Sequence, residues 1–126
     1  MIPHGIQRIP RSAALPATFR GGVVAIGNFD GVHRGHQAVL GCALEKAKEL
    51  GVPALVLTFE PHPRQVFRPD VPLFRITTAP VRARLLGVLG FGAVVEQPFD
   101  RVFSLLSAED FVRRILDEDL GIGHAV

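Results

Sequence analysis

The feature that most constrains the fold is a repeated alternation of short apolar runs with longer helical patterns. Residues 22–27 are apolar without alternating polarity, which is typical of a strand buried on both faces. Residues 36–50 then carry apolar side chains at three- and four-residue spacings, and Gly51 with Pro53 marks the end of this predicted helix. A buried strand followed at once by an amphipathic helix is the first half of a strand–helix–strand unit.

The same alternation continues along the rest of the chain. Strands are predicted at 54–59 and 93–96, and helices at 78–90 and 107–121. An apolar triplet after the last helix predicts the start of a fourth strand, so we expect the natural domain to continue beyond Val126. This order favours an α/β fold with a parallel sheet and helices on both faces, incomplete at its C-terminus.

The helix predicted at 78–90 has Thr78 in position to cap its N-terminus. Its apolar stripe is expected to face the core. The stripe consists of Val81, Leu85, Leu86 and Leu89.

Composition excludes several classes of protein. Apolar residues make up 48% of the 126 residues, which excludes a disordered chain and allows one domain with a real core. The formal charge of +2 is scattered, so nucleic-acid binding is not expected. No apolar run approaches the roughly 18 residues that span a bilayer, and the single Cys42 cannot form an internal disulfide. We therefore expect a cytoplasmic protein without a membrane partner.

The segment of residues 27–36, between the first strand and the first helix, carries the chemistry. Its sequence is Gly-Asn-Phe-Asp-Gly-Val-His-Arg-Gly-His. Ligands of open α/β sheets bind beyond the carboxyl ends of strands, and unpaired N–H groups at a helix N-terminus favour an anion. His33 and His36 would project to the same side of an opening helical turn, where imidazoles can donate hydrogen bonds to phosphate oxygens. The segment therefore predicts a polyphosphate site.

Other interpretations of this segment are weaker. It contains neither G-x-G-x-x-G nor G-K-[ST], so a dinucleotide fingerprint and a P-loop are not supported. Asp30, His33 and His36 could be taken as metal ligands, but no further cluster supports zinc. Two histidines in a glycine-rich turn can also be structural. The coincidence of strand, three glycines, both histidines and a helix start favours a site.

Two further groups of residues are given structural roles from the sequence. Thr77 and Thr78 are interpreted as helix caps rather than substrate ligands. Phe99, Phe103 and Phe111 are interpreted as core residues.

The motif His33-Arg-Gly35-His36 resembles the H-x-G-H signature of the nucleotidylyltransferase superfamily. The whole segment 27–36 is similar to the N-terminal FMN adenylyltransferase module of bacterial bifunctional FAD synthetases, in which a riboflavin kinase module follows. The resemblance extends from about Leu15 to the last residue. Further segments resemble the family in the same order, at 58–63, 76–78, 98–100 and 106–111.

The resemblance implies a Rossmann-like nucleotidylyltransferase fold. It also implies an enzyme that transfers AMP from ATP to FMN, giving FAD and pyrophosphate. Mg²⁺ would be carried by the phosphates, with no metal site built from the protein. It implies that His33, His36 and Asn28 act in catalysis. The residues implied to hold the nucleotide are Gly27, Phe29, Asp30, Gly31 and Gly35. Those implied to bind the flavin are Thr58, Phe59, Glu60, Pro61, His62, Pro63 and Arg64. The chain has no Trp or Tyr, so aromatic packing on the flavin would come from Phe59 or another of the nine phenylalanines.

The chain also departs from the family pattern. Residues 1–20, punctuated by Pro3, Pro10 and Pro16, are interpreted as an exposed irregular lead-in, and residues 21–126 as a partial FMN adenylyltransferase domain. The segments that complete the family's phosphate site are absent, and so is the riboflavin kinase domain. We expect the parent enzyme to make FAD and to phosphorylate riboflavin, and the 126-residue chain alone to have little or no activity.

Two alternative functions stay open at this point. The parent enzyme could also be a homo-oligomer. One is another H-x-G-H nucleotidylyltransferase, acting on phosphopantetheine or nicotinamide mononucleotide, against which the Phe-Glu-Pro-His-Pro segment at 59–63 argues. The other is a non-catalytic nucleotide- or flavin-binding module or remnant.

Overall fold

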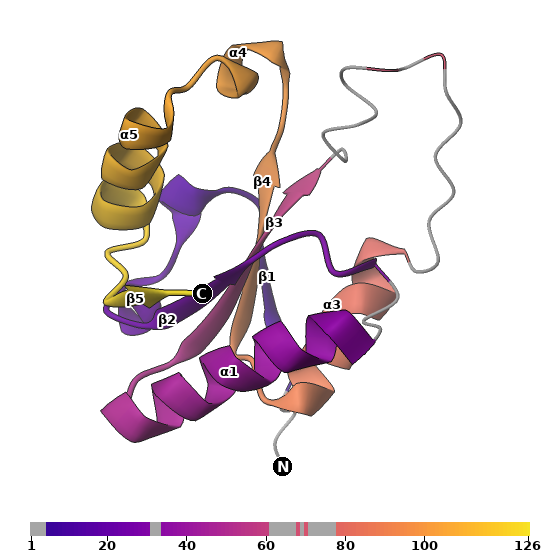
Figure 1. Ribbon diagram of the computed structural model, residues 1–126, viewed down its shortest axis with the longest axis vertical. Helices are drawn as coiled ribbons and strands as arrows, with labels where there is room; N and C mark the ends of the chain where they lie inside the picture. Colours follow the sequence, from indigo (N-terminus) through magenta and orange to yellow (C-terminus); the bar gives the residue numbers. More distant parts are fainter. Residues whose placement is uncertain (1–4, 31–33, 61–67, 69, 71–77) are drawn as a thin grey trace.

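A computed structural model of the chain describes residues 5–30, 34–60, 68, 70 and 78–126 (Figure 1). The described residues form one five-stranded sheet, all parallel, in the order β1-β4-β3-β2-β5. The strands are β1 (Gln7–Ile9), β2 (Val23–Ile26), β3 (Ala54–Glu60), β4 (Ala93–Pro98) and β5 (His124–Ala125). The helical elements are η1 (Ser12–Ala14), η2 (Ala17–Phe19), α1 (Arg34–Leu50), α3 (Ala79–Leu89), α4 (Arg101–Ser104), α5 (Ala108–Asp110) and η4 (Phe111–Asp119). The predicted α/β fold is confirmed.

Both faces of the sheet are buried, which is why its central strands lack alternating polarity. Helices α1 and α3 lie on one face of the sheet, and the segment that contains η4 lies on the other (Figure 1). Val23 and Val56 belong to the core on the α1 and α3 face, whereas Val24 and Leu55 belong to the core on the η4 face. All four are fully buried. Helices on both faces were predicted, and this is confirmed.

The connections divide between the two faces. The steps from β2 to β3 and from β3 to β4 pass through α1 and α3 on one face, whereas the return from β4 to β5 passes through η4 on the other. This division is expected when every crossover has the same hand. β2 lies between β3 and β5, so the path of the chain reverses there. Such a switch point is where open α/β sheets bind ligands.

The predicted fourth strand is present as β5, in which His124 pairs with Val23. The lead-in predicted for residues 1–20 is wrong in its described part, because Gln7–Ile9 forms β1 and pairs with β4. Ile9 and Ser12 are buried. The backbone of Ser12 donates a hydrogen bond of 2.7 Å to Gln97 Oε1. Three residues are too few to show a strand period, and β1 forms because it pairs the edge of β4.

Helix α3 is rotated relative to the predicted apolar stripe. Its buried residues are Arg82, Ala83 and Leu86. Of the predicted stripe only Leu86 is buried, and the exposed members are Val81, Leu85 and Leu89. The predicted cap is confirmed, since Thr78 Oγ1 accepts a hydrogen bond from the backbone N–H of Val81. The buried face of α3 therefore contains an arginine, and most of the predicted apolar stripe lies outside that face.

The last helical segment begins as predicted and then changes its winding. The Ser107 hydroxyl accepts a hydrogen bond from the Asp110 N–H at 3.0 Å. From Phe111 the segment is a π-helix rather than the α-helix predicted for 107–121. Its last carbonyls are satisfied by the Arg20 guanidinium, which lies 3.0 Å from Glu118 O and 2.9 Å from Asp119 O. Acidic residues at the C-terminal end of a helix are unfavourable because they lie at the negative end of its dipole, and the positive charge of Arg20 offsets this. Arg20 is far away in the sequence, so no local pattern predicts the contact.

Two glycine substitutions test the packing of the sheet. In Gly22→Ala the new Cβ would lie 2.6 Å from the carbonyl oxygen of Pro53, a backbone atom that cannot move aside, so we expect a loss of about 2 kcal/mol in the free energy of unfolding. Gly41→Ala meets no atom within 4 Å inside α1 and should instead stabilise the chain by about 0.5–1 kcal/mol. Chemical denaturation measures both. Equal effects of the two substitutions would contradict this packing.

Candidate functional site

The carboxyl ends of the central strands are tied together through the turn that follows β2. The backbone N–H of Gly27 donates to Leu57 O at 3.0 Å, and Asn28 Oδ1 accepts from the N–H of Phe59 at 3.3 Å. The turn, residues 27–30, therefore rests on the end of β3. Asn28 was expected to act in catalysis. In the structure its side-chain oxygen accepts this hydrogen bond from the backbone of β3.

Phe29 gives the turn its shape. Its φ of 53° is left-handed, which costs a residue other than glycine roughly 1–2 kcal/mol. The ring is 4% exposed and belongs to the core cluster beneath α1. A Cβ on Gly27 would lie 2.9 Å from Phe29 Cζ, so glycine at 27 makes room for the ring. Because the ring is buried, Phe29 can present only its backbone to a nucleotide.

Helix α1 starts close behind the turn, at Arg34 rather than at the predicted His36. The imidazole of His36 is half-buried and meets the Phe29 ring edge-on, with 5.2 Å between ring centroids. Gly35 is exposed in the first turn of this 17-residue helix. The other predicted residues of the motif, Gly31 and His33, lie outside the described residues. The described part brings the turn, a helix N-terminus and one of the two predicted imidazoles to the same edge of the sheet.

Arg82, from α3, is the residue that the sequence analysis missed. Its side chain is buried beneath the ends of three strands. Nη1 donates to Asn28 O at 3.1 Å, and Nη2 donates to Glu60 Oε1 at 2.7 Å and to Thr58 Oγ1 at 3.2 Å. Glu96 Oε2 of β4 lies 3.9 Å from Nη2. One guanidinium thus contacts the turn, β3 and β4.

A weak sequence signal for this position exists. Ala79, Ala83 and Leu86 share a helix face with Arg82. That face is narrower and less apolar than the competing stripe, and it contains a charge, so hydropathy alone selects the wrong face.

The predicted flavin residues divide between the two faces of the sheet. Thr58 is fully buried, its hydroxyl lying 3.4 Å from Val95 O, and it lies with Glu60 on the Arg82 side. Phe59, between them in β3, points to the opposite face, as alternation along a strand requires. Pro61, His62, Pro63 and Arg64 lie outside the described residues.

Phe59 belongs to an aromatic cluster with three residues beyond β4. Its ring centroid lies 5.7 Å from that of Phe99, 6.0 Å from Phe103 and 6.4 Å from Phe111. These separations are in the range that favours aromatic pairs. Phe103 and Phe111 pack against the core, as predicted.

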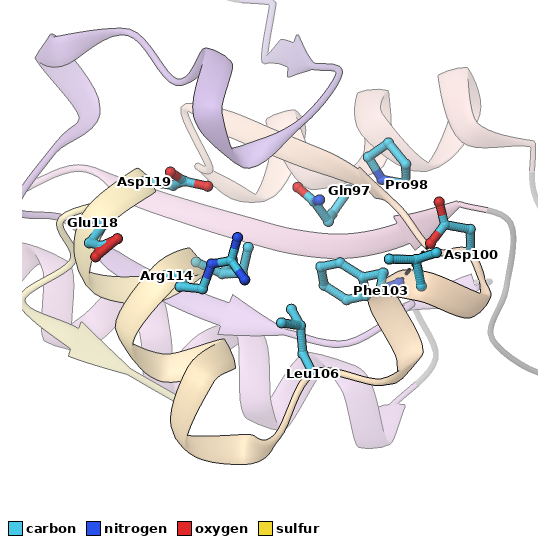
Figure 2. Close-up of a pocket in the computed structure, with 10 residues that line it drawn as sticks. Gln97, Pro98, Asp100, Phe103, Leu106, Arg114, Glu118 and Asp119 are labelled. Carbon is cyan, nitrogen blue, oxygen red and sulfur yellow. Dashed lines mark hydrogen bonds between the residues drawn. The ribbon is translucent and has the colours of Figure 1, made fainter.

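A cavity of about 470 Å³ adjoins this cluster through Phe103 and lies between the end of β4, α4 and η4 (Figure 2). It is lined by Gln97, Pro98, Asp100, Val102, Phe103, Leu106, Arg114, Ile115, Glu118 and Asp119. Asp100 Oδ1 accepts from the Phe103 N–H at 2.7 Å, and Asp119 Oδ2 accepts from the Ser12 hydroxyl at 2.7 Å. The volume suits a small molecule, and the wall is partly apolar and partly charged.

Among the described residues, no group of three His, Cys, Asp or Glu side chains is placed to hold a metal ion. What the described edge offers is backbone N–H groups, one imidazole and a buried guanidinium. Such groups bind and orient anions, and none of them is arranged as a nucleophile with a general base.

Comparison with known proteins places these observations in a family. A profile of the FAD synthetase family matches residues 15–126. The bifunctional riboflavin kinase/FMN adenylyltransferase of Pseudomonas fluorescens is 48% identical over 105 residues, covering 83% of this chain and 33% of that protein. The protein of the same name from Escherichia coli K12 is 38% identical over 119 residues, covering 94% of this chain and 36% of that protein. The chain thus spans about a third of the length of these relatives.

A solved structure has the same fold. The crystal structure titled macrolide-efflux protein, from Streptococcus pneumoniae, superposes with a TM-score of 0.82 at 27% sequence identity. The match covers 96% of this chain and 47% of that one.

Substitution of Asn28 tests the link between the turn and β3. Asn28→Ala removes the oxygen that accepts from the Phe59 N–H, and we expect it to lower the free energy of unfolding by about 1 kcal/mol. Asn28→Asp keeps an acceptor oxygen and should lose less than half as much. Urea denaturation of the two variants beside the unaltered chain provides the measurement. If both variants lose the same amount, the side-chain contact does not stabilise the turn.

Proposed function

Because the chain belongs to the FAD synthetase family, we propose that it supplies the adenylyltransferase site that transfers AMP from ATP to FMN, giving FAD and pyrophosphate. The observation that carries the proposal is the position of the turn at residues 27–30. It follows β2 at the switch point of the sheet, it is tied to the end of β3, and it leads into the N-terminus of α1. The match to relatives named FMN adenylyltransferase supports the choice of reaction.

The nucleotide is proposed to lie over the turn and the start of α1. Gly27, Phe29, Asp30, Gly31 and Gly35 would present backbone to it, which agrees with the buried ring at position 29. The positive end of the helix dipole at the N-terminus of α1 would attract the phosphates. The imidazoles of the H-x-G-H motif, at positions 33 and 36, would donate hydrogen bonds to the phosphate oxygens and stabilise charge on the departing pyrophosphate.

The chemistry requires little beyond this placement. A phosphate oxygen of FMN attacks the α-phosphorus of ATP, a new P–O bond forms, and the bond to the β-phosphate breaks. The phosphate is already an anion at neutral pH, so no general base has to activate it. Transfers of this kind depend on positioning and on electrostatic stabilisation. Mg²⁺ would neutralise charge on the phosphates and be held by them, with few protein ligands.

The flavin is proposed to bind at the end of β3, with the segment 58–64 as its loop. Phe59 is the expected aromatic partner in this set. The structure supports an aromatic environment there, because Phe99, Phe103 and Phe111 gather around Phe59 at the same edge of the sheet. The side chains of Thr58 and Glu60 are engaged by Arg82, so we propose that they act by holding the loop rather than by touching the flavin.

Two properties of the complete gene product extend the proposal. The relatives are named as bifunctional, and we propose that the complete product also phosphorylates riboflavin to FMN. We also propose that it acts in the cytoplasm. No helix in the described part of the chain is both long and apolar enough to cross a bilayer.

The H-x-G-H histidines provide the test. In the complete gene product, His33→Ala and His36→Ala should each lower the rate of FAD formation from FMN and ATP by at least about 100-fold, because each removes a donor aimed at developing charge. Riboflavin phosphorylation should be retained. Chromatographic separation of FAD from FMN measures the first activity, and circular dichroism verifies that the variants are folded.

Cys42→Ser, on the exposed side of α1, is the matched control and should leave FAD formation unchanged. Parallel assays with phosphopantetheine and nicotinamide mononucleotide in place of FMN test the substrate. Adenylylation of either in preference to FMN, or unchanged FAD synthesis by both histidine variants, would contradict the proposal.

A further inference from the structure

Arg82 is a charged residue in a position that an apolar one could fill. It is 1% exposed, although three apolar side chains of α3, at Val81, Leu85 and Leu89, are 37% to 40% exposed. Taking a guanidinium out of water is costly unless its partners are well placed, and a buried ion pair is seldom the most stable choice. Places where a chain breaks its own hydrophobic pattern in this way are often functional or strained sites.

We propose that Arg82 is a positioning residue that sets the spacing between the turn at residues 27–30 and Glu60, the last residue of β3. This inference rests on the proposed function, in which the nucleotide lies over the turn and the flavin lies beyond Glu60. Arg82 would touch neither substrate. It would hold the two binding segments at the separation that brings the FMN phosphate to the α-phosphorus.

The first argument is the geometry of the guanidinium. Its two terminal nitrogens reach different segments, one the carbonyl of Asn28 and the other the carboxylate of Glu60. Because the group is planar and rigid, these two contacts are fixed relative to each other. A lysine has a single terminal nitrogen and cannot reproduce both with the same geometry.

The second argument is the strain in the turn. The carbonyl that Arg82 binds belongs to the peptide joining Asn28 to Phe29, the residue with φ of 53°. Rotating that peptide would move both the carbonyl and the backbone that follows it. The hydrogen bond of 3.1 Å therefore helps hold the left-handed conformation on which the course of the chain toward α1 depends.

The third argument is that Arg82 is itself held on its far side. Glu96 Oε2 lies 3.9 Å from Arg82 Nη2, and the other carboxylate oxygen of Glu96 lies 3.1 Å from Arg8 Nη2 in β1. Charges of alternating sign thus run from Glu60 through Arg82 and Glu96 to Arg8. Arg82 Nε has no hydrogen-bond partner among the described residues, so the described polar contacts of the guanidinium are made by its terminal nitrogens. Glu96 of β4, itself paired with Arg8 of β1, thus contacts the guanidinium on one side, and the two binding segments contact it on the other.

Steady-state kinetics of the complete gene product test the proposal. In Arg82→Met, kcat for FAD formation should fall about 30-fold or more, because small misplacement of reacting groups is costly, while KM for ATP and for FMN changes less than about threefold. Arg82→Lys should recover part of kcat. Arg84→Met, two residues along the same helix and exposed, is the matched control and should stay within about twofold of the unaltered protein.

Loss of stability must be separated from loss of positioning. All assays are run at least 15 °C below the midpoint of thermal unfolding measured for each variant. A loss of 1 kcal/mol in stability lowers that midpoint by only roughly 2–8 °C, so each variant stays folded during the assay. The double variant Arg82→Met/Glu60→Gln should be no slower than Arg82→Met alone, because the two residues act as one unit. A kcat for Arg82→Met within twofold of the unaltered protein would overturn the proposal.

A second measurement does not depend on activity. With 4-fluorophenylalanine placed at position 29, the ¹⁹F resonance reports the conformation of the turn. It should shift or broaden in Arg82→Met and stay in place in Arg84→Met. If the ¹⁹F resonance does not change in Arg82→Met, Arg82 does not hold the turn, and the proposal is overturned even if the unaltered protein makes FAD. If the unaltered protein makes no FAD, the proposed function fails, and the ¹⁹F comparison still decides whether Arg82 holds the turn.

Discussion

The arrangement at the edge of the sheet depends on one ion pair, between the buried Arg82 and the partly buried Glu60. Arg82 lies on the inward face of α3 with Ala83 and Leu86, and the apolar side chains of Val81, Leu85 and Leu89 stay exposed. The guanidinium of Arg82 also reaches the turn after β2 and the end of β3. A charge pair of this kind contributes little net stability compared with apolar packing. Its proposed contribution is to fix the geometry of the candidate site.

The fold supplies the rest of the site through its topology. Because β2 lies between β3 and β5, the path of the chain across the sheet reverses there, and the helices that follow β2 and β4 lie on opposite faces. The turn and the start of α1 lie on one side of this edge. The phenylalanine cluster and the adjoining cavity lie on the other. The proposed transfer of AMP from ATP to FMN would use this division, with donors for phosphate on one side and an apolar wall for a flat ring on the other.

Much of this could be predicted from the sequence, because the relevant signals are local. The strands β2, β3 and β4 begin as apolar runs, and Thr78 and Ser107 cap helices through hydrogen bonds that the structure contains. The elements that escaped prediction depend on partners far away in the chain. β1 exists because β4 has an edge to pair, and the π-helix ends on a guanidinium from Arg20. Arg82 was missed for the same reason, since its hydrogen-bond partners lie 22 to 54 residues away.

The alternation at the end of β3 also restricts how this family of sequences can vary. Thr58 and Glu60 face the guanidinium, and Phe59 faces the phenylalanine cluster. Inserting or deleting one residue within the strand would exchange the two faces, placing a carboxylate among the aromatic rings and a ring against the buried cation. We therefore expect natural variants to tolerate substitutions along β3 far more readily than changes in its length.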